Sequence, residues 1–92
     1  MGAKPRRHYR NSEFERLWRA AKASFRRGEY GDAAATYAQS AAHEADLELI
    51  VDRDLRQSYR LYYYSDVAAA LCESGNAGAG LAMISRAIAL GG

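Results

Sequence analysis

Apolar residues recur at three- and four-residue steps along most of the chain, which is the spacing of one face of an α-helix. Ser12 is followed by Glu15 three positions later, a pattern that caps helix starts, and Gly28 is suited to ending a helix. The sequence therefore predicts a first helix from about residue 12 to residue 27. Its apolar stripe consists of Phe14, Leu17, Trp18, Ala21 and Phe25.

The next stretch contains no Gly or Pro from Asp32 to Ser74. One helix of that length would span roughly 60 Å and could not fold back, so a break is expected. We place it near His43–Asp46, with Asp46 capping a third helix that ends at Ser74 and Gly75. The inner faces of the second helix carry Ala33, Ala34, Tyr37, Ala38 and Ala41, and the third helix carries Leu49, Ile50, Leu55, Tyr59, Tyr62, Tyr63, Val67 and Leu71.

A fourth helix is predicted from about residue 77 to residue 90, which makes the fold class all-α. Proline occurs only at Pro5, and the content of 49% hydrophobic and 26% charged residues is typical of a soluble globular chain. We expect residues 1–10 to form a flexible basic arm and residues 11–92 to form a single helical domain.

Four tyrosines lie close together in the predicted third helix. At helical spacing Tyr59, Tyr62 and Tyr63 share a face, while Tyr64 turns away from it. We expect the first three to pack in the core and Tyr64 to be left over as a candidate interface residue.

The two glycine turns share a pattern that indicates an internal repeat. A small residue lies seven positions before each glycine (Ala21, Ala68) and five after it (Ala33, Gly80), and a large apolar residue follows at nine (Tyr37, Ile84). This pattern resembles the tetratricopeptide repeat, although Gly28 and Gly75 are 47 residues apart, where that repeat usually has 34. A helical bundle of another family is the alternative.

The resemblance implies two antiparallel helix pairs in a right-handed superhelical arrangement, with a lengthened third helix. It also implies that the first helix of each pair lines a concave groove for a protein or peptide partner. Carried over position by position, the groove residues are Trp18, Arg19, Lys22, Phe25 and Arg26 on one wall, and Tyr62, Ser65, Asp66, Ala69 and Glu73 on the other.

The formal net charge of +2 hides an asymmetry, since residues 1–28 carry +7 and the remainder −5. Arg19, Lys22 and Arg26 follow the spacing of one helical face, so they form either a strip that attracts an acidic peptide or an ordinary solvated face. The arm is a second basic feature, which suggests a nucleic-acid contact as the alternative function. Its cations are Lys4, Arg6, Arg7 and Arg10.

The predicted last helix is almost entirely apolar, with Arg86 as its only charged residue. Such a helix is normally covered on several sides, so we expect it to be buried against a second copy or a larger partner. The alternative is that the long third helix covers it. The proposed self-association residues are Leu81, Met83, Ile84, Ile88 and Leu90.

Catalytic, metal and cofactor motifs are not predicted. His43-Glu44 lacks the second histidine of a zinc-protease helix, and Cys72, expected to be a small buried hydrophobe, has no nearby histidine. We therefore expect a non-enzymatic adaptor or scaffold without cofactor or metal. A lone cysteine and the lack of a membrane-spanning run lead us to expect a cytoplasmic protein that does not enter membranes.

Overall fold

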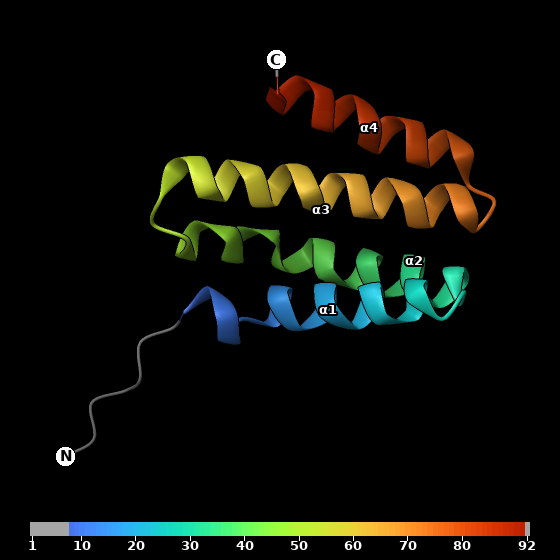
Figure 1. Ribbon diagram of the computed structural model, residues 1–92, viewed down its shortest axis with the longest axis horizontal. Coiled ribbons are helices and arrows are strands. Elements are labelled where there is room, and N and C mark those ends of the chain that lie inside the picture. The colour runs from blue at the N-terminus through green and yellow to red at the C-terminus, as the bar shows by residue number, and fades with distance from the viewer. Residues whose placement is uncertain (1–7, 92) are drawn as a thin grey trace.

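The computed structural model describes residues 8–91, which fold into α-helices joined by two tight turns and one longer 3₁₀ segment. Successive α-helices run antiparallel to one another (Figure 1). The all-α prediction is confirmed for these residues. The α-helices are α1 (Glu13–Arg26), α2 (Tyr30–Ser40), α3 (Arg53–Glu73) and α4 (Ala77–Gly91), and two 3₁₀ segments are η1 (Tyr9–Asn11) and η2 (Ala41–Leu49).

Local signals set the ends of α1 and the two tight turns. The Ser12 hydroxyl accepts a hydrogen bond from the Glu15 amide at 3.2 Å, as the cap prediction requires. Gly28 and Gly75 adopt positive φ angles of 79° and 91°, a conformation in which a side chain would be strained. The predicted turns after the first and third helices are therefore confirmed.

The predicted cap of the third helix is wrong, because α3 begins six residues later than expected. Asp52 caps it, accepting a hydrogen bond from the Leu55 amide at 2.9 Å. The carboxylate of Asp46 instead accepts a hydrogen bond from the Phe14 amide at 3.2 Å, so it lies at the start of α1. Leu49 and Ile50, assigned from sequence to the third helix, lie at the end of η2 and just after it.

Aromatic side chains dominate the core. Phe14, Trp18 and Tyr63 contact one another through tilted or edge-on rings, with centroids 4.6 to 5.8 Å apart. The Tyr63 hydroxyl is 2.6 Å from the Ser40 hydroxyl, which donates to the Tyr37 carbonyl at 2.7 Å. Burial raises the pKa of Tyr63. This buried polar pair joins α2 to α3 inside an otherwise apolar centre.

The tyrosine prediction needs a correction. Tyr64 is buried, and Tyr62 is the exposed ring, with 62% of its surface accessible. Tyr63 is buried and Tyr59 packs against the core, as expected. Tyr64 is covered because α3 has neighbours on two sides, η2 on one and α4 on the other.

Small side chains occupy the positions that the repeat pattern marks. Ala21, Ala33, Ala68 and Gly80 are all buried. A Cβ atom at Gly80 would lie 2.5 Å from Cys72 Sγ and 3.2 Å from the Ala68 carbonyl oxygen, so α3 and α4 approach closely there. The expectation of a buried Cys72 is wrong, because Cys72 is exposed at the edge of the contact between α3 and α4.

The flexible arm predicted for residues 1–10 must be shortened. Tyr9 is buried, with its ring 5.4 Å from that of Tyr59 and 6.4 Å from that of Phe14. Burial, with Glu15 nearby, raises the pKa of Tyr9. The residues from Tyr9 onward therefore belong to the folded unit, and residues 1–7 lie outside the described part of the chain.

The described part of the molecule is elongated and thin, with extents of 52 × 31 × 19 Å. The α1–α2 pair lies against α3, and α3 separates this pair from α4 (Figure 1). Among the described elements α4 packs against α3 alone. One side of α4 is consequently left without a covering helix.

Candidate functional site

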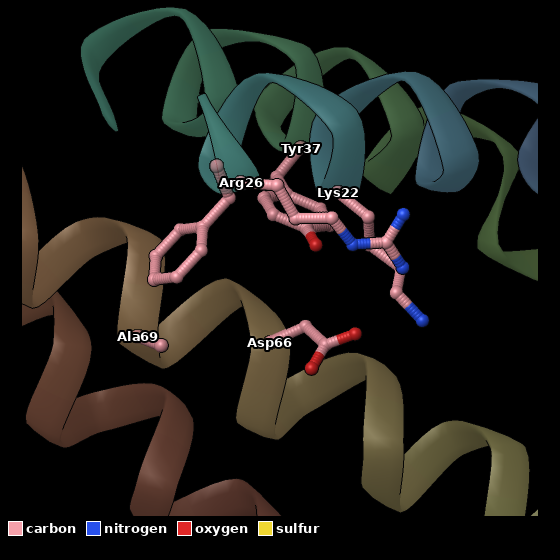
Figure 2. A pocket seen from close by; sticks show the side chains of 6 residues that line it. Lys22, Arg26, Tyr37, Asp66 and Ala69 are labelled. Atoms are coloured by element: carbon pink, nitrogen blue, oxygen red, sulfur yellow. The ribbon is translucent and has the colours of Figure 1, made fainter. Parts of the chain in front are cut away.

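A hollow between α1 and α3 brings together several of the predicted groove residues. Its volume is about 100 Å³, and Lys22 and Arg26 reach over it toward the Asp66 carboxylate on α3 (Figure 2). All of its lining residues except Tyr37 were predicted from sequence as groove residues. The lining consists of Lys22, Phe25, Arg26, Tyr37, Asp66 and Ala69.

Trp18, predicted as a groove residue, does not line this hollow and is buried in the core. Its indole N–H donates to the Asp66 carboxylate at 2.8 Å, and the Lys22 ammonium lies 6.0 Å from the centre of the ring. The indole therefore fixes the Asp66 carboxylate and leaves little of itself exposed for a ligand. This makes Trp18 a positioning residue for the hollow.

Most cations of α1 and the following turn are neutralised by neighbouring acids. Arg16 pairs with Glu13, Arg19 with Glu15, and Arg27 with Glu29 at 3.2 Å. Lys22 and Arg26, which line the hollow, have no ion pair within the described residues. The hollow is therefore the place on α1 where the cations form no ion pair, although the Asp66 carboxylate faces them across it.

Tyr37 supplies the hollow with an aromatic wall from α2. Burial, followed by the negative charge of Asp66, raises the pKa of its phenol, so the hydroxyl stays protonated even in mild alkali. Sequence reasoning placed Tyr37 on the inner face of the second helix but did not assign it to the groove. Its position nine residues after Gly28 was the available signal.

The remaining predicted groove residues lie elsewhere. Arg19 lines a different hollow, with Tyr9, Arg10 and Tyr59. Ser65 donates to the Leu61 carbonyl at 3.0 Å and lines the hollow between α3 and α4. Tyr62 and Glu73 are exposed on α3 and line none of the hollows described above.

The predicted self-association residues divide into two groups. Met83 and Leu90 are partly buried against the core, whereas Leu81, Ile84 and Ile88 are 63%, 39% and 68% exposed. The exposed group adjoins a hollow of about 530 Å³ between α3 and α4, whose lining is apolar apart from Ser65. The structure thus leaves uncovered an apolar surface that the alternative prediction would have hidden under α3. The lining consists of Leu61, Ser65, Ile84, Ala87, Ile88 and Gly91.

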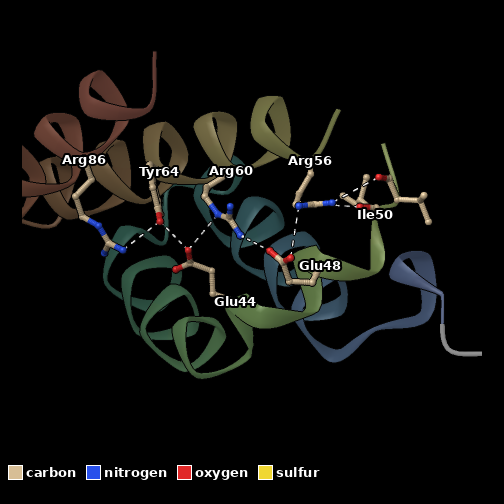
Figure 3. Close-up of polar contacts among 8 residues, drawn as sticks. Glu44, Glu48, Ile50, Arg56, Arg60, Tyr64 and Arg86 are labelled. Carbon is tan, nitrogen blue, oxygen red and sulfur yellow. Dashed lines mark hydrogen bonds and ion pairs between the residues drawn. The ribbon is translucent and has the colours of Figure 1, made fainter. Parts of the chain in front are cut away.

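A chain of polar contacts on another side of α3 was not predicted (Figure 3). Arg86 donates to the Tyr64 hydroxyl at 3.1 Å, and this hydroxyl donates to Glu44 at 2.6 Å. Arg60 then pairs with Glu44 at 3.5 Å and with Glu48 at 3.4 Å. These contacts join α4, α3 and η2, and they hold the only charged side chain of α4.

The contacts continue toward the start of α3. Arg56 pairs with Glu48 at 3.5 Å and donates to the Ile50 carbonyl at 3.1 Å (Figure 3). Burial, with the hydrogen bond to Glu44, raises the pKa of Tyr64. Arg56 and Arg60 follow the four-residue spacing of one face of α3. Their acidic partners lie in η2, and the sequence did not predict the conformation of that segment.

The candidate nucleic-acid residues are only partly described. Lys4, Arg6 and Arg7 lie outside the described residues, and Arg10 is exposed in η1. Within residues 8–91 no group of three or more His, Cys, Asp or Glu side chains is arranged to hold a metal ion. None of the described helices combines the length and apolar character that crossing a membrane requires.

Comparisons of the chain with protein families, with curated proteins and with solved structures find no match. Function is therefore inferred from the α1–α3 hollow, the α3–α4 hollow and the charges around them.

Proposed function

We propose that this chain is a non-catalytic protein-binding scaffold, a cytoplasmic adaptor with a tetratricopeptide-like build. The repeat pattern supports this family, because its four small positions are buried and both glycine turns have positive φ. Two features depart from it, the inserted η2 segment and the exposure of Ile84 at a position that the pattern assigns to packing.

The observation that carries the proposal is the pair of cations, Lys22 and Arg26, that form no ion pair within the described residues and lie beside an aromatic wall. A carboxylate placed between the two would gain charge-assisted hydrogen bonds that no described side chain now supplies. Asp66 opposes them, but one of its oxygens is taken by the Trp18 indole. Its remaining acceptor capacity suits a backbone N–H of the same bound segment.

The size of the hollow favours one side chain over a cofactor. Clefts for small-molecule ligands commonly hold about 300–1,000 Å³, and this one holds about 100 Å³. The favoured ligand is thus a partner segment that inserts one acidic side chain and lays an apolar neighbour on Phe25. Such segments match the predicted acidic protein or peptide partner.

The apolar α4 surface is the second part of the proposed scaffold. Exposed apolar patches rimmed by polar residues mark protein interaction sites. Through this surface the chain would dock to a larger partner or to another copy of itself. The groove and this surface share α3 but are lined by different residues of it, and they open beside α1 and α4 respectively, so a scaffold could use both at once.

Selection of peptides from a random display library on the full chain tests the groove. We expect enriched sequences to carry an acidic residue next to an apolar one, and a synthetic peptide to bind in fluorescence anisotropy. The Lys22→Glu/Arg26→Glu variant should lose at least tenfold in affinity, because it reverses both cations. The matched control is Arg16→Glu, which alters an exposed arginine of the same helix that does not line this hollow.

Enrichment of basic peptides, or equal binding by the two variants, would contradict the groove. Circular dichroism of each variant checks that the helices are retained.

The alternative function is nucleic-acid association through the basic N-terminal residues. Ion pairing of Arg16 and Arg19 with α1 glutamates weakens the contribution of the first helix. The test is removal of residues 1–7, which spares the buried Tyr9. Nucleic-acid binding at low salt that disappears in this truncation would favour the alternative, whereas peptide binding should survive it.

A further inference from the structure

Three exposed aliphatic side chains form a stripe along α4. Leu81, Ile84 and Ile88 follow three- and four-residue steps, so they lie on one side of the helix. They are exposed because α4 packs against α3 alone among the described elements. We call these three residues the α4 stripe.

A depression beside the α4 stripe can receive apolar side chains. The hollow between α3 and α4 is bordered by Leu61, Ile84 and Ile88, while Ser65, Ala87 and Gly91 are too small to fill it. Its volume is about 530 Å³, several times the volume of about 100 Å³ of the α1–α3 hollow. The surface therefore presents both projecting side chains and a recess of matching chemistry.

The α4 stripe carries no charge. Arg86 is the only charged residue of α4, and at about 100° per residue it projects roughly 200° around the helix from Ile84. It lies 4.6 Å from the Tyr64 ring and donates to the hydroxyl of that residue, on the side facing η2. A strongly charged partner would form no ion pairs with the α4 stripe. The surface that complements the α4 stripe is therefore an uncharged aliphatic stripe of similar length.

The chain itself supplies such a stripe. Leu81, Ile84 and Ile88 are spaced almost evenly about the Ile84–Ser85 position. Two antiparallel copies of α4 therefore bring Leu81 opposite Ile88 of the partner subunit and Ile84 beside its own equivalent. Exposed Ser85 and Ala89 border the stripe and are small enough for two helices to approach closely.

We propose that a second copy of this chain covers the α4 stripe, with the two α4 helices antiparallel about a two-fold axis near Ile84 and Ser85. The contact is isologous, since each copy offers the same projecting side chains and the same recess. This inference rests on the proposed function, in which α4 is a docking surface, and it names the partner of that surface.

The first test is sedimentation of the full chain over a range of concentrations. The mass of the 10.1 kDa chain should double as concentration rises. The Leu81→Glu/Ile88→Glu variant should weaken the dimer at least about a hundredfold, because each copy would bury two unpaired carboxylates. Val51→Glu is the matched control, since Val51 is 91% exposed and lies before α3, away from the stripe.

The second test fixes the geometry without disturbing the stripe. Ser85→Cys, placed in a Cys72→Ser background, should form a disulfide-linked dimer on mild oxidation, while Val51→Cys in that background should stay unlinked. A monomer at every concentration overturns the proposal. A dimer that survives the double glutamate variant, or one that Ser85→Cys does not link, overturns this interface.

The same samples separate this inference from the groove function. The Lys22→Glu/Arg26→Glu variant should still dimerise, and the Leu81→Glu/Ile88→Glu variant should still bind the selected peptide. A monomeric chain that binds the peptide would refute the two-fold contact and leave the groove standing. A dimer that selects no peptide would refute the groove and leave the two-fold contact standing.

Discussion

Residues that cap the helices and form the turns of this fold have partners at very different distances along the chain. Ser12 and the two turn glycines act within a few positions of themselves, so their roles could be read from neighbouring letters. Asp46 bonds to an amide 32 positions away, which no local pattern encodes. For Tyr62 and Tyr64, helical spacing gives the angle between the two side chains around the helix axis. It does not give which side of α3 other elements cover.

At the residue scale, the Tyr63–Ser40 pair yields a stability prediction. Tyr63→Phe should lower the free energy of unfolding by about 1 kcal/mol, because it removes the buried contacts of the hydroxyl with Ser40 at 2.6 Å and with the Tyr37 carbonyl at 3.4 Å. The loss stays modest because Ser40 keeps its bond to the Tyr37 carbonyl. Chemical denaturation measures it, with Tyr62→Phe as the control that should change stability by less than about 0.5 kcal/mol.

A Tyr63→Phe variant as stable as the parent chain would show that the hydroxyl contributes nothing net to the fold.

At the element scale, the helix interiors were predicted well and the segment between α2 and α3 poorly. Residues 41–49 are good helix formers, so their composition favours continuation of α2. They form 3₁₀ turns instead, with Leu47 buried in the core and Asp46 at the start of α1. Tertiary contacts thus override local preference, and residues 41–49 pack against α1, α2 and α3.

The contact between α3 and α4 gives the element-scale prediction. Gly80→Ala should be about 1–3 kcal/mol less stable than Gly78→Ala, because its methyl group would press on Cys72 Sγ and the Ala68 carbonyl oxygen. A methyl at Gly78 meets nothing within 4 Å, and there alanine should add up to about 1 kcal/mol through helix propensity. Thermal or chemical unfolding of both variants measures the difference.

Adding Cys72→Ala to each variant completes a double-mutant cycle. Removing the sulfur should restore part of the stability that Gly80→Ala loses, and it should restore none in Gly78→Ala. Equal effects of Cys72→Ala in the two variants would mean that the close approach of α3 and α4 does not limit stability.

At the scale of the whole molecule, the repeat pattern located the α1–α3 hollow but not all of its walls. Lys22, Arg26 and Asp66 meet there because α1 and α3 lie side by side, with Phe14 and Trp18 of α1 packed against Tyr63 of α3. Ser65 directly precedes Asp66 and so turns about 100° away, toward α4. Which side of α4 remains bare depends on the number of helices packed around it, a property of the assembled fold.

The whole molecule should also lose stability in alkali. Tyr9, Tyr37, Tyr63 and Tyr64 have pKa values raised above the ordinary 10.0, with burial as the leading cause in each. In the unfolded chain these phenols ionise near pH 10, whereas the folded chain keeps them protonated. The unfolded state therefore binds fewer protons than the folded state above pH 10. The contribution of these tyrosines to the free energy of unfolding is constant below about pH 9 and should fall as pH rises further.

Absorbance at 295 nm, which reports phenolate, and helical circular dichroism follow the two processes on one sample. Ionisation of the buried tyrosines should coincide with loss of helix, because a phenolate cannot form inside the aromatic core without separating α2 from α3. In a Tyr63→Phe variant the free energy of unfolding should depend less steeply on alkaline pH, since one of the ionising groups is gone. Complete titration of all seven tyrosines near pH 10 with the helices intact would mean that water reaches the core, and the packing described for Tyr63 would be wrong.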